Sequence, residues 1–271
     1  MPELPEVETT LRGIAPIAVG RRVAAMHVYD RRLRWAVPDA LPKLVAGRTI
    51  DALTRRSKYL LFRFSEDTLL VHFGMTGSLR AFANPPSRRP HDHVDIVLDS
   101  GVTLRYHDPR RFGAMLWLPP PAMAHPLLAK LGPEPFDPSC DAAYLWRATR
   151  SRSVAVKLAL MDSRLIVGVG NIYANESLFR AGIRPTTPVN RVSKPRFERL
   201  VREVRTTLAE AIAEGGSTLR DYVDSNGEPG YFQHQHLVYG RRGLPCRVCG
   251  SAIRQIRQGA RPTSYCPRCQ R

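Results

Sequence analysis

Four of the five cysteines have a spacing that suits a metal ion. They form two Cys-x-x-Cys pairs, Cys246 with Cys249 and Cys266 with Cys269, and sixteen residues separate the pairs. Each pair would present two sulfur atoms from a tight turn, and the segment between the pairs is long enough for a β-hairpin. Four thiolates leave no open coordination position, so we predict one structural Zn²⁺, with an iron–sulfur cluster as the alternative. The fifth cysteine, Cys140, is expected to be a small buried side chain.

The second residue has the chemistry of a nucleophile. If Met1 is removed, Pro2 carries a secondary amine that can form an iminium with an aldehyde-like carbon. An α-amino group titrates near about 8, below the roughly 10.4 of a lysine side chain, and a helix that begins at Pro5 would lower that pKa further. Glu3 and Glu6 are three residues apart, so both could lie beside the amine and transfer protons. The alternative is that these two acids only cap the helix.

The chain is strongly basic. Its formal net charge is +17 and its pI is near 10.4, and only five of its 41 basic residues are lysine. A GC-rich genome could account for part of the arginine excess, but a globular chain this basic usually binds a polyanion, and nucleic acid is the first candidate. Arg254, Arg257 and Arg261 lie between the two cysteine pairs, where a hairpin would present them to such a partner. No apolar run approaches the roughly 20 residues that span a bilayer, and the acidic start is unlike a signal peptide, so we expect an intracellular protein.

The elements that must position these residues differ between the two halves of the chain. A short helix is predicted from Pro5 to about Gly13, because proline suits a first turn and the acids beside it favour the positive end of a helix. Between Val23 and Leu118 the pattern changes to period two in short runs, which predicts a β-sandwich. The predicted strands are Val23–Tyr29, Tyr59–Phe64, Thr68–Phe73, Val94–Leu98, Val102–Tyr106 and Phe112–Leu118.

Breakers at Pro119–Pro121 and Gly132–Pro138 indicate a domain boundary, and the chain beyond them has helical periodicity. Residues Gly216–Phe232 are too irregular for an element and long for a connection, which is typical of a functional loop. We therefore predict an α+β multidomain fold: a β-sandwich domain with an N-terminal helix over 1–132, a helical domain over 133–235 and a zinc module over 236–271. The predicted helices are Val154–Met161, Ile172–Ala181 and Pro195–Glu214.

The string from Pro2 to Thr9, Pro-Glu-Leu-Pro-Glu-Val-Glu-Thr, closely resembles the start of formamidopyrimidine-DNA glycosylases. The resemblance continues along nearly the whole chain, in the order that the family has. The matching blocks are Arg56–Leu60, His72–Gly77, Asp108–Gly113, Met161-Asp162, Val167–Glu176 and the terminal four cysteines. The related endonuclease VIII branch usually opens Pro-Glu-Gly-Pro-Glu, so Leu4 favours the branch that acts on oxidised purines.

The resemblance implies a base-excision repair enzyme that joins a β-sandwich to a helix–two-turns–helix domain and a zinc finger. Such enzymes bind double-stranded DNA that contains an oxidised base or an abasic site. They flip 8-oxoguanine or a formamidopyrimidine out of the stack, attack C1′ with the N-terminal proline, and then, as a lyase, eliminate both flanking phosphates from the Schiff base. The family pattern implies catalytic roles for Pro2, Glu3, Lys58 and Arg261, with Glu6 in support.

The same pattern implies a set of DNA contacts. Met75, Arg110 and Phe112 would fill or wedge the gap that the flipped nucleotide leaves, with Arg110 pairing with the orphaned base. Without the resemblance, Met75 and Phe112 would be interpreted as core residues, and Lys58 as a solvated charge at a strand edge. The residues expected to bind or surround the DNA backbone, besides Arg261, are His72, Lys157, Asn171 and Tyr173.

Two positions limit what the resemblance implies. Pro262 stands where the family more often has a small residue, and it removes a backbone donor at the predicted hairpin tip. Gly216–Phe232 corresponds to the loop that caps the flipped base, but the pattern does not say which of its residues contact that base.

Two alternatives stay open. One is an endonuclease VIII-like glycosylase for oxidised pyrimidines, and the other is a non-catalytic DNA-binding protein that has kept the scaffold. Pro2, Glu3 and Lys58 disfavour the second, because a binding protein does not need them. We also expect a monomer in the bacterial cytoplasm, associated with the nucleoid and not with a membrane.

Overall fold

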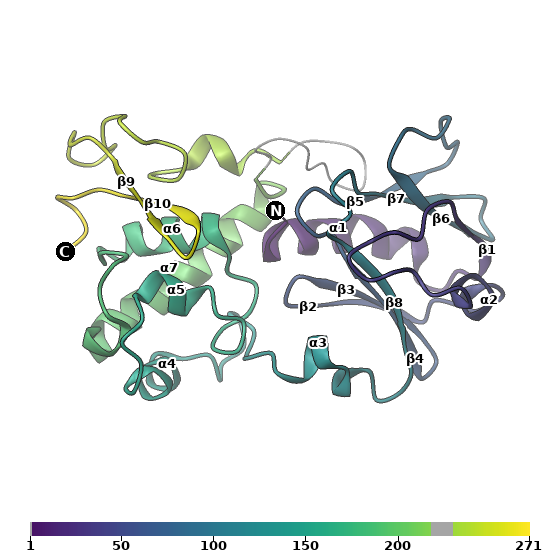
Figure 1. Cartoon of the computed structure of the whole chain (residues 1–271), viewed down its shortest axis with the longest axis horizontal. Coiled ribbons are helices and arrows are strands. Elements are labelled where there is room, and N and C mark those ends of the chain that lie inside the picture. The colour runs from purple at the N-terminus through teal and green to yellow at the C-terminus, as the bar shows by residue number, and fades with distance from the viewer. Residues whose placement is uncertain (1, 218–229) are drawn as a thin grey trace. The chain divides into compact units, whose positions relative to one another are not determined.

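The computed structural model describes residues 2–217 and 230–271 and divides into two compact units (Figure 1). One unit comprises residues 1–129 with 214–231, and the other comprises 130–213 with 232–271. Of the predicted loop Gly216–Phe232, residues 218–229 lie outside the described part of the chain. Among the helices that are described, none is both long enough and apolar enough to cross a membrane.

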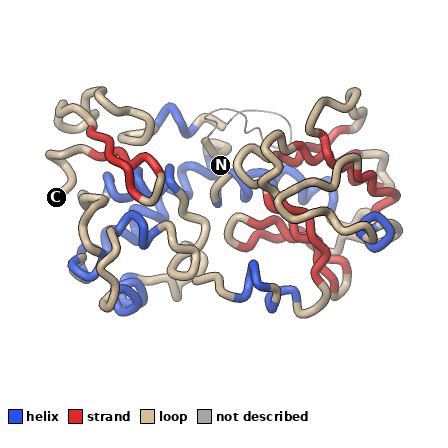
Figure 2. The backbone as a smooth tube through the Cα atoms, in the orientation of Figure 1, coloured by secondary structure: helices blue, strands red, loops and turns tan. Residues whose placement is uncertain are grey.

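Two four-stranded antiparallel sheets form most of the first unit, and Figure 2 shows their strands in red. The sheets have the strand orders β1-β6-β7-β5 and β2-β3-β4-β8. A single hydrophobic core contains side chains from both sheets, which is the β-sandwich that the sequence predicts. The strands are β1 (Val23–Val28), β2 (Ala52–Arg56), β3 (Tyr59–Phe64), β4 (Asp67–His72), β5 (Ser78–Phe82), β6 (Asp92–Leu98), β7 (Thr103–His107) and β8 (Ala114–Leu118).

Helix α1 (Leu4–Ala18) begins with a capping box. The Glu3 carboxylate accepts a hydrogen bond from the backbone N–H of Glu6, and the Glu6 carboxylate accepts one from the N–H of Glu3 at 2.7 Å. These two bonds satisfy N–H groups that the first turn of a helix leaves unpaired. The predicted end at Gly13 is wrong: the helix runs on to Ala18, because its later turns pack side chains such as the fully buried Ile14 into the core.

The six predicted strands are confirmed to within about two residues, but β2 and β5 were not predicted, because their short, half-polar sequences alternate weakly. The last predicted strand began too early. β8 starts at Ala114, since Arg111 has a positive φ of 56° that no strand accommodates, and this keeps Phe112 in a loop. The remaining elements of the unit are α2 (Leu41–Val45), the 3-10 turn η1 (Ala122–Ala124) and α3 (Pro126–Ala129).

The second unit is helical apart from one hairpin. Its three predicted helices are confirmed to within two residues, whereas α4 was not predicted. Cys140, just before α4, is fully buried, as expected. The elements are α4 (Ala142–Thr149), α5 (Val156–Leu160), α6 (Asn171–Arg180), η2 (Val189–Arg191), α7 (Lys194–Ala213), η3 (Phe232–Gln235), β9 (Arg254–Gln258) and β10 (Arg261–Tyr265).

The cysteine-containing segment packs on α6. Phe179 of that helix shares a small hydrophobic cluster with Ile253 and Cys266. The fully buried Glu176 carboxylate accepts hydrogen bonds from three successive backbone N–H groups, 237 to 239, at 2.7–3.0 Å. These contacts attach the segment before the first cysteine pair to the helix, so that α6 and the hairpin form one packed body.

Candidate active site and nucleic-acid interface

Two buried acidic side chains, Glu3 and Glu6, lie next to Pro2 at the start of the chain. Pro2 directly precedes the capping box and is buried, and the Glu3 and Glu6 side chains are only 2% and 1% exposed. Besides the N–H of Glu3, the Glu6 carboxylate accepts a hydrogen bond from the backbone N–H of Ser217 at 2.8 Å. A Cβ atom added to Gly216 would lie 3.0 Å from the Glu6 side chain, so glycine allows this close approach. The Glu6 carboxylate therefore holds both Glu3, the residue after Pro2, and the beginning of the loop Gly216–Phe232 that is expected to cover the flipped base.

Lys58 lies in the two-residue turn between β2 and β3 rather than within a strand, which corrects the expectation from sequence. The other turn residue, Ser57, has a positive φ of 58°. Arg55 holds this turn in place: its guanidinium donates to the carbonyl of Ser57 at 2.9 Å and to the Glu8 carboxylate of α1 at 3.0 Å. The turn that carries Lys58 is thus tied to the helix that follows Pro2.

His72 ends β4 opposite Tyr59 in the sheet, with the two rings 5.0 Å apart. Burial, together with the positive charges of Lys58 and Arg34, lowers the pKa of His72 to about 4. The imidazole is therefore neutral near pH 7. Its Nδ1 atom accepts a hydrogen bond from the backbone N–H of Gly74 at 3.3 Å, which leaves Nε2 as the protonated nitrogen and a donor.

Met75 and Phe112 occupy two loops that meet backbone to backbone. One loop follows β4 and the other precedes β8, and these strands pair so that His72 faces Ala114. Gly74 has a φ of +61°, and a Cβ atom there would lie 2.5 Å from the Gly113 nitrogen. Both large side chains are exposed despite this tight packing, Met75 by 36% and Phe112 by 44%. They are exposed side chains and not the core residues that the sequence alone would indicate.

Buried polar groups fix the second loop. The carboxylate of Asp108, which is fully buried, accepts a hydrogen bond from the N–H of Gly113 at 2.8 Å. The Tyr106 hydroxyl donates to the carbonyl of His72 at 2.9 Å and so joins the two loops. Arg110 lies on the same loop with its guanidinium 5.0 Å from the Phe112 ring. Neither Tyr106 nor Asp108 was predicted as a site residue from the sequence, although Asp108 is the first residue of the matching block Asp108–Gly113.

Arg111 fixes the middle of this loop in a strained conformation. Its positive φ is unusual for a residue with a Cβ atom. The guanidinium donates to the Asp30 carboxylate at 2.6 Å and to the Arg32 carbonyl at 3.2 Å. Hydrogen bonds from Arg32 and Arg111 hold the pKa of Asp30 far below its usual range. The ionised Asp30 carboxylate, through its bond to Arg111, therefore stabilises the turn that carries Arg110 and Phe112.

In the second unit, Asn171 and Arg261 come from elements that pack on each other. Asn171 is the first residue of α6, after a glycine-containing turn in which Gly168 has a φ of +79°. Arg261 is the exposed first residue of β10. Tyr173 is fully buried, with its ring 5.8 Å from that of Phe232, so it supports the turn from the core. Asn171, whose side chain offers an amide N–H₂ donor, is 7% exposed, and together with the guanidinium of Arg261 it can bind an anion.

Lys157 is fully buried, like Tyr173 and unlike the exposed Arg261. Its ammonium donates to the carbonyl of Pro262 at 3.1 Å and to the hydroxyl of Thr263 at 2.7 Å, and both acceptors belong to β10. Lys157 therefore contacts the hairpin that carries Arg261.

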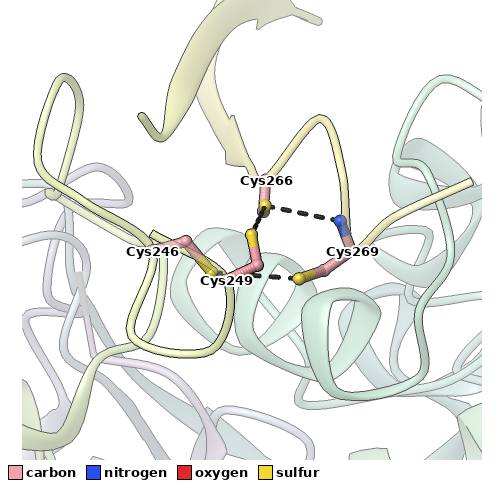
Figure 3. A group of neighbouring side chains, drawn as sticks. All are labelled: Cys246, Cys249, Cys266 and Cys269. Atoms are coloured by element: carbon pink, nitrogen blue, oxygen red, sulfur yellow. Dashed lines mark hydrogen bonds between the residues drawn. The ribbon is translucent and has the colours of Figure 1, made fainter. Parts of the chain in front are cut away.

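The four cysteines converge as their spacing predicts (Figure 3). All four sulfur atoms lie within 4.8 Å of one another. The Cys246 and Cys269 sulfurs are 3.9 Å apart, and those of Cys249 and Cys266 are 3.4 Å apart. A tetrahedral Zn²⁺ with bonds of about 2.3 Å needs sulfurs about 3.8 Å apart, so this set fits one structural zinc ion. The backbone N–H of Cys269 donates to the Cys266 sulfur at 3.4 Å, which stabilises a thiolate.

Three family models match the chain. The formamidopyrimidine-DNA glycosylase N-terminal domain matches residues 1–115, the H2TH domain of that glycosylase matches 131–223, and the zinc finger found in FPG and IleRS matches 243–271. The formamidopyrimidine-DNA glycosylase of Paraburkholderia phymatum is 57% identical over 277 residues, and that of Methylococcus capsulatus is 54% identical over 271, with all of each chain covered.

Solved structures are similar over the whole chain. The crystal structure of the MutM (Fpg) protein from Thermus thermophilus has a TM-score of 0.89 at 41% identity and covers 99% of this chain and 98% of that one. A complex of Lactococcus lactis Fpg with DNA containing an abasic site has a TM-score of 0.91 at 31% identity and covers 99% of both chains.

Proposed function

The chain belongs to the formamidopyrimidine-DNA glycosylase family and is a DNA glycosylase for oxidised purines; we propose that it uses the amine of Pro2 as its nucleophile and then cleaves the strand as a lyase. The observation that carries this proposal is the buried pair Glu3 and Glu6, which directly follows Pro2 and is held by the capping box. The capping box uses both acids, but capping does not require them to be buried beside a potential amine nucleophile.

The proposed reaction begins when the Pro2 lone pair attacks C1′ of the flipped nucleotide. The bond from C1′ to the base breaks, and the base leaves with that electron pair and with the proton that the Pro2 nitrogen gives up. Glu3 donates a proton to the ring oxygen as the C1′–O4′ bond opens, which leaves an iminium between Pro2 and the sugar. Removal of a proton from C2′ then expels the 3′ phosphate, and a second elimination expels the 5′ phosphate. Glu6 supports Glu3 through the hydrogen bond to its N–H, and Lys58 contacts a phosphate or the leaving base.

The two loops that carry Met75, Arg110 and Phe112 form the proposed wedge. Flipping a nucleotide costs a few kcal/mol of stacking and pairing. The exposed Met75 and Phe112 side chains would recover part of that cost by stacking in the gap. The Arg110 guanidinium would donate to the orphaned base, and cytosine offers acceptors that suit it.

Two residues of the second unit, Asn171 and Arg261, form the proposed phosphate clamp. Donation from the Asn171 side chain and from the Arg261 guanidinium suits a phosphate. In the first unit, the neutral His72 offers its Nε2 donor to the DNA backbone as a separate proposed contact. The buried Tyr173 and Lys157 support the same clamp indirectly: Tyr173 supports the turn before α6, and Lys157 holds the hairpin that carries Arg261. The zinc ion that the four cysteines would bind supplies no chemistry to the reaction; it fixes the hairpin.

Borohydride trapping tests the mechanism. The protein with Met1 removed should form a covalent adduct with a duplex that contains 8-oxoguanine opposite cytosine, and strand cleavage should leave phosphates at both ends of the gap. A native protein that gives no adduct would refute the enzyme and leave the DNA-binding alternative. Faster excision of thymine glycol than of 8-oxoguanine would instead identify the pyrimidine-directed alternative.

Glu3→Gln is the informative variant, because a glutamine oxygen can still accept the capping hydrogen bond from Glu6 N–H while the side chain no longer exchanges protons. We expect it to fold normally and to lose base excision by a factor on the order of 10² or more. Pro2→Gly is a weaker test, because the new terminal glycine also carries an amine. An unimpaired Glu3→Gln variant would remove Glu3 from the proposed mechanism.

A further inference from the structure

Two side chains of the helical unit hold β10 immediately after Arg261. The ammonium of Lys157, on α5, donates to the carbonyl of Pro262 and to the hydroxyl of Thr263. The amide oxygen of Asn175, on α6, accepts the backbone N–H of Ser264 at 2.8 Å. Three consecutive residues of the strand are therefore fixed to the helices.

Asn175 also bonds to the first residue of its own helix. Its side-chain nitrogen donates to the carbonyl of Asn171 at 2.5 Å, and the side chain is fully buried. The two partners settle the orientation of the amide, because the reverse orientation would set its nitrogen against the N–H of Ser264 and its oxygen against the carbonyl of Asn171. One side chain thus joins the start of α6 to the strand that begins with Arg261.

The burial of Lys157 indicates what its charge does. A buried ammonium is costly unless acceptors surround it, and β10 supplies two of them, the Pro262 carbonyl and the Thr263 hydroxyl. Charge-assisted hydrogen bonds of this kind are stronger than neutral ones and are directional. The tip of the hairpin is also confined, since a Cβ atom on Gly259 would lie 3.1 Å from the Leu158 side chain.

We propose that Lys157 and Asn175 are positioning residues that hold Arg261 at a fixed place relative to Asn171, so that the two phosphate-binding side chains form one preassembled clamp. The proposal rests on the clamp proposed above. Proline is compatible with this role, because the bond from Lys157 uses the backbone carbonyl of residue 262 and does not need the N–H that proline lacks. A clamp that is already ordered loses less conformational entropy when DNA binds.

The salt dependence of DNA binding tests the proposal, because each lost phosphate contact flattens the slope of log K against log salt by about 0.9. The probe is a duplex with a central tetrahydrofuran, which mimics an abasic site. Arg261→Ala should flatten the slope by one contact. Lys157→Met and Asn175→Leu should each flatten it by up to the same amount, because a displaced hairpin misplaces Arg261. Lys194→Met is the matched control, since it removes one positive charge from the exposed first residue of α7 and should leave the slope unchanged.

The double variants decide between positioning and contact. If Lys157 and Asn175 act through Arg261, then adding either substitution to Arg261→Ala should change the slope no further. A slope lost additively, about 1.8 in all for Lys157→Met with Arg261→Ala, would mean that Lys157 contacts a phosphate itself and would overturn the positioning role. An unchanged slope in Arg261→Ala would refute the clamp, and the positioning with it.

Zinc content, measured as zinc released per chain by a thiol reagent, separates positioning from loss of the finger. We expect each single variant to retain one zinc ion. If Lys157→Met loses zinc, Asn175→Leu carries the test, since it removes no charge. A wild-type slope in Asn175→Leu with zinc retained would overturn the proposal for that residue.

Discussion

Gly74→Ala tests whether the loop that carries Met75 and the loop that carries Phe112 must be in backbone contact. The alanine would need a φ of +61°, which costs about 1 kcal/mol for a residue with a Cβ atom. Its methyl group would also start 2.5 Å from the Gly113 nitrogen and 2.8 Å from the Phe112 oxygen. Carbon atoms need about 3.5 Å, so the loops must separate by about 1 Å, and overpacking of this kind costs about 1–3 kcal/mol more.

Gly101→Ala is the matched control for this change. Gly101 has a φ of +85° in the turn between β6 and β7, and a Cβ atom there meets nothing within 4 Å. The control therefore carries the backbone cost of about 1 kcal/mol without the clash. In urea unfolding we expect Gly74→Ala to be less stable than Gly101→Ala by about 1–3 kcal/mol.

The functional difference should be larger than the difference in stability. A displacement of about 1 Å in a positioned group can cost on the order of 10²-fold in rate. Single-turnover excision of 8-oxoguanine should fall by that order in Gly74→Ala, and it should stay at the wild-type rate in Gly101→Ala. If the two variants match in stability and in excision rate, the contact between the loops does not position Met75 and Phe112 and the reasoning is wrong.

Three further predictions follow from named contacts. His72 binds a proton near pH 6.5 in the unfolded state but only near pH 4 in the folded state. Its contribution to stability is therefore complete above pH 6.5 and is lost as the pH falls toward 4, by up to about 3 kcal/mol. Urea titrations should show a smaller loss of stability over this pH range in His72→Asn. Tyr106→Phe removes the donor to a strand-end carbonyl and should cost about 1–3 kcal/mol in the same assay, whereas no loss would mean that water replaces the hydroxyl. Chelation of zinc, or Cys266→Ser, should abolish DNA binding, and circular dichroism should still report the folded β-sandwich; retained binding would contradict a structural role for the metal.

The parts of the fold that could be predicted are those with local causes. The four cysteines converge because each pair needs only a tight turn, and α7 follows from the spacing of its own apolar residues. The end of α1 was misjudged because Gly13 signals a stop locally, while the core packs the turns beyond it. Phe112 was assigned to a strand for the same reason: its neighbours alternate, but the φ of Arg111 depends on Asp30, 81 residues away in sequence.

In the site, too, features with local causes could be predicted, and features that depend on contacts between distant residues could not. A family pattern names Met75, Arg110 and Phe112, yet it does not say that their loops are locked together by Gly74 and Tyr106, since those contacts link separate strands. Lys157 also has the residue type and the motif position of a DNA contact, and only the fold reveals that its ammonium is buried against the hairpin. Side chains that act through another residue leave no spacing signal of their own.

The burial of Pro2 has a consequence for how the protein is made. An aminopeptidase that removes Met1 must hold the residues that follow the bond it cuts, and in the folded chain Pro2 is buried with Glu3 and Leu4. Removal must therefore take place while the nascent chain is still extended, before α1 packs on the sandwich. Under the proposed mechanism, a chain that folds with Met1 still attached would be well formed and inactive, so the ratio of active to total enzyme would be set during translation.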